Sequence, residues 1–250
     1  MSSTSAISIE QPLPGVCLIR MQDRQSKNTF SVALTEGLME AFAHVKQNTE
    51  YKVVVLTGYD NFFASGGTQE DLLELSEGNG SFSDRDLYSL ALNCEIPVIS
   101  AMQGHGIGGG FVLGLFADSI FLSRESVYTT NFMKYGFTPG MGATMIVPKK
   151  LGIVLAEEML FGAANYRGAE LKERGVPFKV LPRAEVLPAA LEMAALLAEK
   201  PRLSLVTLKS HLVEQMRNEL PSFIEKEVKM HDATFGQPEV RDRINSLFGQ

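Results

Sequence analysis

The sequence contains few of the residues that mark disulfide-bonded, metal-binding or membrane proteins. Its 250 residues include two cysteines, Cys17 and Cys94, too few for a disulfide framework or, by themselves, for a structural zinc site. The four histidines show no metal-ligand spacing. No apolar run approaches the ~20 residues that a membrane helix needs, and residues 1–8 lack the basic start and apolar stretch of a signal peptide. We therefore expect a cytoplasmic protein with two buried, reduced thiols.

Positive charge is also scarce. The chain has 23 lysines and arginines against 29 aspartates and glutamates, a net charge of −6, and this balance excludes the basic footprint of a duplex-binding protein. Hydrophobic residues make up 45% and charged residues 21%, which is enough apolar material for a large core. Because the chain shows neither an internal repeat nor a low-complexity linker, we expect one α/β domain.

The first half of the chain alternates short apolar runs with helical patterns. The run Val53–Thr57 is continuously apolar, which is typical of a strand buried on both faces. Apolar residues at three- and four-residue intervals predict a helix that begins after a cap at Thr29 or Ser31 and ends near Gln47. A shorter helix is expected near Leu87–Leu92. Further strands are expected at residues 16–21, 97–102 and 119–123.

Beyond Gly140 strands become scarce, and Val176–Leu181 is the one clear β run. We expect a β-rich core over residues 1–195 and a helical region over residues 196–250 that belongs to the same domain. Helical patterns cover Val154–Phe161, Arg167–Glu173, Glu185–Glu199, Leu203–Leu220 and Ser222–Thr234.

Two glycine-rich segments follow predicted strands. The first, Gly104-His-Gly-Ile-Gly-Gly-Gly110, matches the dinucleotide-binding pattern G-x-G-x-x-G. However, it lies in mid-chain, and neither Asp118 nor Glu125 is well placed to hold a ribose. A second interpretation is that its last glycines open a helix over Gly109–Phe116, where free N–H groups can bind an oxyanion.

The second segment contains Gly66-Gly67 between the Val53–Thr57 strand and a short helix. Gly67 can therefore offer a second backbone donor, and two donors aimed at one point would form an oxyanion hole. Each segment taken singly also fits a plain tight turn.

The chain resembles the crotonase family, which comprises enoyl-CoA hydratases and isomerases. The resemblance implies a ClpP/crotonase-like spiral of ββα units, trimeric assembly, and a thioester oxygen held by the N–H groups of Gly67 and Gly109. The matching motifs, in family order, are Val53-Val-Val-Leu-Thr-Gly58, Phe62-Phe-Ala-Ser-Gly-Gly67, Pro97-Val-Ile-Ser-Ala-Met-Gln-Gly104, Gly108-Gly-Gly110, Ala117-Asp118 and Gly136-Phe-Thr-Pro-Gly-Met-Gly142.

Two departures from the family pattern argue against hydration. Hydratases of this family deliver water with two glutamates, and this sequence has Val112 and Phe132 at those positions. Apolar side chains cannot activate water or move a proton. Together with Phe137, they are expected to line an apolar substrate pocket, although a plain core would look the same.

One subgroup resembles the chain more closely, namely the decarboxylating crotonase-like enzymes of polyketide β-branching. The resemblance runs through Met102-Gln-Gly-His105, Glu125-Ser-Val-Tyr-Thr-Thr-Asn-Phe-Met-Lys-Tyr-Gly-Phe-Thr-Pro139 and Tyr166-Arg-Gly168. It implies decarboxylation of a 3-methylglutaconyl thioester on acyl carrier protein, with His231 as proton donor and no metal or redox cofactor. The substrate would arrive on the phosphopantetheine of the carrier protein, and the partners would be other enzymes of the β-branching cassette. The chain itself would form a homotrimer or a dimer of trimers.

A lysine of the subgroup has no counterpart here. The chain has no lysine between Lys52 and Lys134, and Leu75 or Ser81 takes the candidate position. Arg85 could neutralise the substrate carboxylate, although a solvated loop arginine would look the same. His105 is expected to have a structural role.

Arg24 and Lys27 are the candidate basic residues that would meet the carrier protein beside the pantetheine entrance, with Lys149 and Lys150 as a weaker pair. Each of the four also fits an ordinary solvated charge.

Two other functions remain open. The chain could be an isomerase or hydratase of a CoA ester, or a catalytically weak member kept as an assembly component.

Overall fold

Two β-sheets form the centre of the molecule. The structure is a computed structural model, and it describes residues 5–78, 80, 82 and 86–249. Neighbouring strands of the larger sheet are parallel except for the antiparallel pair at one edge. Its strand order is β1 (Ile7–Leu13), β2 (Val16–Met21), β3 (Val53–Thr57), β5 (Val98–Met102), β7 (Ser119–Ser123) and β10 (Lys179–Leu181).

The chain passes from the larger sheet to a smaller one three times. Strand β3 leads into β4, β5 into β6 and β7 into β8, and helical structure follows each pair, as expected for a spiral of ββα turns. The smaller sheet contains strands of only two or three residues, too short for an alternating pattern to reveal them in the sequence. Its strands, in order, are β4 (Phe62–Ala64), β6 (His105–Ile107), β8 (Val127–Thr129) and β9 (Tyr166–Arg167).

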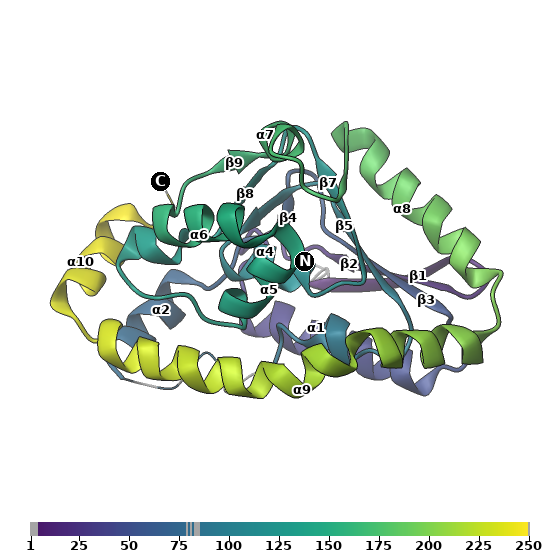
Figure 1. Ribbon diagram of the computed structural model, residues 1–250, viewed down its shortest axis with the longest axis horizontal. Helices are drawn as coiled ribbons and strands as arrows, with labels where there is room; N and C mark the ends of the chain where they lie inside the picture. The colour runs from purple at the N-terminus through teal and green to yellow at the C-terminus, as the bar shows by residue number, and fades with distance from the viewer. Residues whose placement is uncertain (1–4, 79, 81, 83–85, 250) are drawn as a thin grey trace.

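Helices cover both sheets (Figure 1). Helix α8 packs on one face of the larger sheet and closes a separate apolar cluster there, while the main core lies on the other face. Helix α9 runs along the lower edge of the molecule in Figure 1. The helices are α1 (Val32–Gln47), α2 (Gln69–Ser76), α3 (Leu90–Asn93), α4 (Gly109–Leu115), the 3₁₀-helix η2 (Asn131–Tyr135), α5 (Ala143–Leu151), α6 (Ile153–Gly162), α7 (Gly168–Glu173), α8 (Arg183–Ala198), α9 (Arg202–Thr234) and α10 (Pro238–Leu247).

The long elements of the first half were predictable, and the structure confirms them. Every residue of β3 is buried, as its continuous apolar run indicated. Helix α1 begins after Ser31, whose hydroxyl accepts the N–H of Leu34 and satisfies one of the free donors of the first turn. The helix expected near residue 87 begins later, at Leu90, and helices α5 and α10 and strand β1 were not predicted.

The prediction of two helices after residue 202 is wrong, because α9 is a single helix of 33 residues with Pro221 inside it. Proline removes one backbone donor and normally breaks or kinks a helix. Buried contacts on both sides of Pro221 hold this helix together. Lys209 donates to the carbonyls of Ala91 and Ile96 at 2.8 and 3.0 Å, and Glu227 accepts three hydrogen bonds from the start of α5. In the part of the chain that the structure describes, no helix combines the length and apolar character of a membrane span.

Candidate active site

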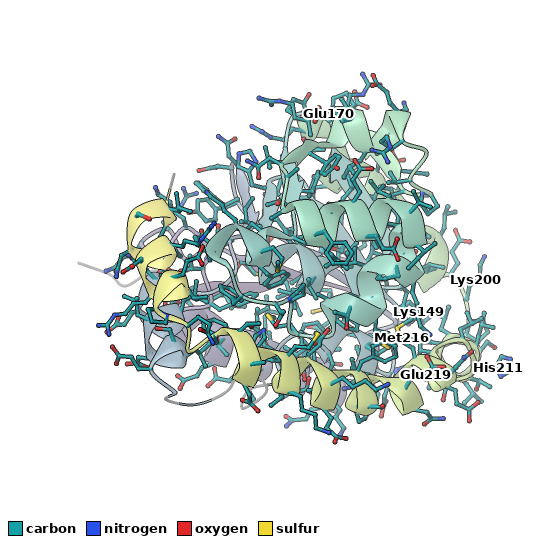
Figure 2. All side chains as sticks on the ribbon, turned by 60° about the vertical axis from the view of Figure 1, so that its left-hand side comes forward. Lys149, Glu170, Lys200, His211, Met216 and Glu219 are labelled. Carbon is teal, nitrogen blue, oxygen red and sulfur yellow. The ribbon has the colours of Figure 1, made fainter. Side chains whose placement is uncertain are left out.

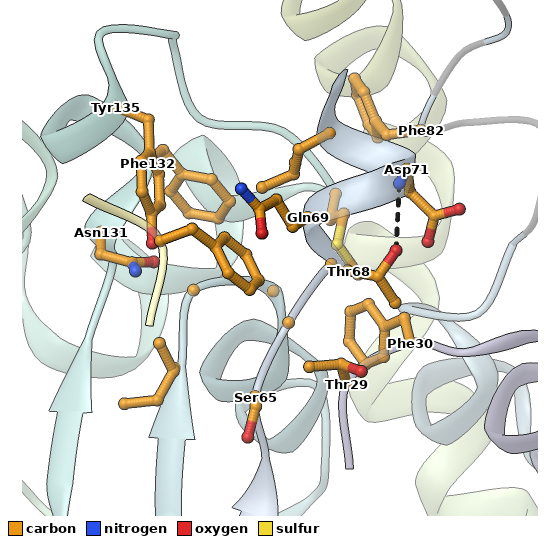
Figure 3. Close-up of a pocket in the computed structure, with 18 of the residues that line it drawn as sticks. Thr29, Phe30, Ser65, Thr68, Gln69, Asp71, Phe82, Asn131, Phe132 and Tyr135 are labelled. Carbon is orange, nitrogen blue, oxygen red and sulfur yellow. Dashed lines mark hydrogen bonds between the residues drawn. The ribbon is translucent and has the colours of Figure 1, made fainter. Parts of the chain in front are cut away.

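A cavity of about 800 Å³ lies at one end of the smaller sheet, among α2, η2 and the C-terminal helices (Figure 3). Its walls are rich in aromatic side chains, and polar groups are spread among them. The aromatic residues are Phe30, Phe62, Phe82, Phe132, Tyr135, Phe137, Phe235 and Phe248. An apolar cavity with a few convergent polar groups is the usual form of a substrate site.

Gly67 lies in this cavity on the loop between β4 and α2. The preceding Gly66 has φ +75°, and a Cβ on it would lie 2.9 Å from the carbonyl oxygen of Ile107 and 3.4 Å from the nitrogen of Gly109. The N–H of Phe30 donates to the Gly66 carbonyl at 2.7 Å and fixes the loop. The two glycine segments predicted from the sequence are therefore in contact.

Gly109 is the first residue of α4 and also faces the cavity. Close packing requires glycine beside it, because a Cβ on Gly110 would lie 2.1 Å from the carbonyl oxygen of Ala64. Among the described residues, neither the Gly67 N–H nor the Gly109 N–H has a hydrogen-bond acceptor. Both donors are thus available to an oxygen atom inside the cavity, as an oxyanion hole requires.

His231 enters the cavity from the last turn of α9. Its Nε2–H donates to the carbonyl oxygen of Thr138 at 2.6 Å, so a neutral ring keeps its lone pair on Nδ1. The rings of Phe82, Phe137 and Phe235 surround it, with centroids 4.6, 5.9 and 5.0 Å away. Burial among them lowers the pKa of His231 to about 4, although the Thr138 carbonyl and the Asp232 charge act in the opposite direction. The imidazole is therefore neutral near pH 7.

The low pKa of His231 predicts a pH-dependent stability. Between its ordinary pKa of 6.5 and about 4, the unfolded chain binds a proton that the folded chain does not, so the free energy of unfolding falls as the pH falls. Over this range we expect the wild type to lose about 2 kcal/mol more than His231→Gln, a value reduced because the cavity leaves the ring partly open to solvent.

Urea titrations at pH 7 and pH 4 measure this difference. The control is His211→Gln, because His211 is an exposed histidine of the same helix (Figure 2). It should follow the wild type, and an equal loss of stability in His231→Gln and the wild type would contradict a lowered pKa of His231.

The predicted pocket residues are only partly brought together. Phe132 and Phe137 line the cavity, with ring centroids 6.1 Å apart. Val112 does not line it, because all of α4 is buried in the core and the helix faces the cavity only through its first residue. Leu75 lines the cavity and places an apolar side chain there. The other two candidates of this region, Ser81 and Arg85, lie outside the described residues.

The four basic residues proposed to meet the carrier protein do not all lie at the cavity either. Lys27 lines the cavity, whereas Arg24 lies outside it, paired with Asp60 at 2.8 Å and stacked on the ring of Tyr59. The weaker pair is not at the cavity. Lys149 pairs with Glu219 at 2.7 Å (Figure 2), and Lys150 donates to the carbonyl of Ala117 at 2.7 Å.

His105 lies in the cavity wall, where its Nδ1 accepts the N–H of Val127 at 2.9 Å. Burial and the nearby charges of Arg183 and Arg167 lower the pKa of His105, which keeps the ring neutral as that bond requires. This bond ties β6 to the start of β8, in keeping with the structural role expected for His105.

Polar residues that the sequence did not reveal also face the cavity, namely Gln69, Asn131 and Lys134 (Figure 3 shows the first two). Gln69 begins α2 and Asn131 begins η2, whereas Lys134 lies in the last turn of η2. Because the short strands before these helices left no pattern in the sequence, no local signal pointed to these residues. In the described part of the chain no group of three histidine, cysteine, aspartate or glutamate side chains is arranged to hold a metal ion.

The chain belongs to the enoyl-CoA hydratase/isomerase family, whose model matches residues 13–247. Within this family its relatives include a decarboxylase: the chain is 63% identical to the bacillaene synthase decarboxylase PksI of Bacillus subtilis, over 98% of both chains. It is 28% identical to the carnitinyl-CoA dehydratase of Salmonella typhimurium, over 80% of this chain and 77% of that one.

Solved structures agree with this placement. A chain of a dehydratase/decarboxylase enzyme couple involved in polyketide β-branching superimposes with a TM-score of 0.98 at 63% identity, covering 98% of this chain and 100% of that one. The ECH2 decarboxylase domain of CurF from Lyngbya majuscula superimposes with a TM-score of 0.95 at 47% identity, with the same coverage. The fold and the resemblance to the decarboxylating subgroup, both predicted from the sequence, are confirmed.

Proposed function

We propose that this protein decarboxylates a 3-methylglutaconyl-type thioester to a 3-methylcrotonyl thioester, as a lyase of polyketide β-branching. The observation that supports this most directly is one aromatic-lined cavity that contains two backbone donors, on Gly67 and Gly109, and one half-buried, neutral histidine, His231. Decarboxylation is also the activity named for the relatives that are 63% and 47% identical.

The reaction needs an electron acceptor and one proton. The bond between the methylene carbon and the carboxylate breaks, CO₂ leaves, and the electron pair spreads through the double bond onto the thioester oxygen. The N–H groups of Gly67 and Gly109 hold the negative oxygen of this dienolate. Protonation at the former methylene carbon returns the electrons and gives the branched enoyl thioester.

His231 supplies that proton. The ring of the free enzyme is neutral, but a substrate carboxylate in the same apolar cavity favours the imidazolium by opposite charge, so His231 takes up a proton as the substrate binds. Since the Thr138 carbonyl engages Nε2–H, the new proton lies on Nδ1 and is the one available for transfer. Solvent restores it in the next cycle.

The experiment that tests this function is mass spectrometry of acyl carrier protein loaded with a 3-methylglutaconyl group and incubated with the protein. We expect the loss of one CO₂ from the acyl group. Parallel reactions with crotonyl thioesters should give no hydration, since Phe132 stands where hydratases of the family have a glutamate and position 112 does not face the cavity. Unchanged carboxylated substrate, or conversion of the uncarboxylated thioesters instead, would overturn the proposal.

We also propose that the substrate is presented on acyl carrier protein, by way of a basic entrance at Lys27. Both proteins are acidic overall if the carrier has the usual negative charge, so attraction requires a local basic site. Lys27 is the cation in the loop that meets the cavity, and Arg24 stands outside it with its charge shared by Asp60.

Reversal of this charge should weaken binding of the carrier without changing the chemistry. We expect Lys27→Glu to raise the KM for the carrier-bound substrate about fivefold at low salt, and less at high salt, because salt screens exposed charges. A short pantetheine thioester should react as before. Lys46→Glu, the same change at an exposed position of α1, is the control. Equal losses on both substrates would mean that residue 27 shapes the cavity instead.

A homotrimer, alone or paired, is the proposed assembly. Large apolar side chains stand exposed on α6, including Val154 at 72% and Phe161 at 77%, and such a patch is expected to be covered by another chain. Light scattering should give three or six times the chain mass, and a monomer at micromolar concentration would exclude this assembly.

A further inference from the structure

Glu227 is a buried carboxylate that the proposed chemistry does not use. It lies on α9 one helical turn before His231 and is fully shielded from solvent. Among the described residues no cation lies within ion-pair distance of it. A charge buried in this way lowers the stability of the fold unless hydrogen bonds satisfy it.

Three donors satisfy the carboxylate, and all come from the start of α5. Glu227 accepts the N–H of Gly142 at 2.7 Å through one oxygen, and the N–H and hydroxyl of Thr144 at 2.8 and 2.6 Å through the other. The first turn of a helix has free N–H groups and a positive dipole end, which suit a carboxylate. Burial raises the pKa of Glu227, whereas these three bonds favour its charged form.

The segment that Glu227 holds is the one that touches the catalytic ring. The Thr138 carbonyl accepts the His231 Nε2–H, and a Cβ on Gly140 would lie 2.9 Å from Cε1 of the same ring. Between these contacts and α5, Met141 and Gly142 have φ values of +63° and +75°, a left-handed turn that costs a non-glycine residue energy. Such a turn keeps its shape only if neighbouring contacts hold it.

Three residues on one face of helix α9 form hydrogen bonds with the segment from Thr138 to Gly142. Glu227 holds its end at Gly142, His231 bonds its start at Thr138, and the hydroxyl of Thr234 accepts the Thr138 N–H at 3.3 Å. Residues 227, 231 and 234 are separated by four and three positions, which places them on one side of the helix. Glu227 does not line the cavity, so it cannot exchange a proton with the substrate.

We propose that Glu227 is a positioning residue for His231: by fixing the turn from Thr138 to Gly142, it sets the orientation of the imidazole and the nitrogen that bears its proton. The catalytic part of this inference rests on the proposed decarboxylation, whereas the part that concerns the ring itself does not.

The test compares Glu227→Gln with Glu219→Gln. Both remove a carboxylate by which α9 holds α5, since Glu219 pairs with Lys149 of α5, but Glu219 is twelve positions before His231 (Figure 2). Glutamine cannot accept all three bonds, so in Glu227→Gln we expect kcat to fall 10- to 100-fold, with KM changed less than about twofold. ¹⁵N NMR of the histidine should show the Nε2–H form of His231 giving way to a mixture of tautomers. Glu219→Gln should match the wild type in both measurements.

A fall in thermal stability of Glu227→Gln with native kcat and a native ¹⁵N spectrum would overturn the proposal, because Glu227 would then be structural only. If wild-type protein lacks decarboxylase activity, the proposed function fails, yet the NMR comparison still decides whether Glu227 orients the ring. If Glu227→Gln does not fold, Thr144→Val decides instead. It removes one of the three donors, and we expect a three- to tenfold lower kcat with a partial tautomer change; native values of both would overturn the proposal.

Discussion

Replacement of His231 with glutamine should lower the rate of decarboxylation by about 10²-fold or more, the usual effect of removing a positioned acid. The side chain of glutamine can still donate a hydrogen bond to the Thr138 carbonyl, as Nε2–H does, but it cannot take up and release a proton near pH 7. Loss of CO₂ measured on a loaded carrier protein gives the rate. The KM should change little, because the two glycine donors proposed to hold the thioester remain.

The control for this variant is His211→Gln, an exposed position of the same helix, which should keep native turnover. A folded His231→Gln protein that keeps near-native turnover would show that another group protonates the dienolate. His105 would then be the group to test, since it is the other histidine in the cavity wall.

Much of the fold could be predicted because long elements leave a local pattern. The continuous run of β3 and the three- and four-residue spacing of α1 each specify an element within one stretch of sequence. Strands β4, β6 and β8 have three residues each, too few for a period to appear. They were missed although they form the sheet beside the site.

Family motifs predicted which residues would share one cavity, whereas features that depend on tertiary contacts could not be predicted. Gly67, Gly109 and His231 were identified from motifs, and the structure brings all three to one cavity. Val112 was misplaced, because a motif gives a position in a helix but not the direction in which that helix is buried. Glu227 was missed because its partners lie more than 80 residues away in the sequence.

The continuity of α9 shows the same limit. Proline within a helical pattern usually marks an end, and this local rule predicts two helices around Pro221. Buried polar contacts of Lys209 and Glu227, one on each side of the proline, dock the helix onto the core at both places. Tertiary contacts therefore outweigh the helix-breaking effect of Pro221, and the continuous helix places His231 in the cavity.

Substitution of Gly109 by alanine should lower kcat by about 10²- to 10³-fold, the usual effect of losing one oxyanion donor. A Cβ at this position would lie 2.5 Å from Sδ of Met141 and 2.9 Å from Cε2 of Phe30, both side-chain atoms that border the cavity. These side chains can move, so the protein should fold, but the close contacts also push on the start of α4. A shift there turns the Gly109 N–H away from the position proposed for the thioester oxygen.

The matched control is Gly162→Ala, at the end of α6, where a Cβ would meet nothing within 4 Å. It should retain native activity and a native melting temperature. Gly110→Ala is unsuitable for this purpose, because its Cβ would lie 2.1 Å from the backbone oxygen of Ala64 and would disrupt the fold itself. A folded Gly109→Ala protein with native kcat would mean that the thioester oxygen is held elsewhere. A loss confined to KM would mean that the new methyl group only obstructs entry, because an oxyanion donor acts on the transition state more than on the bound substrate.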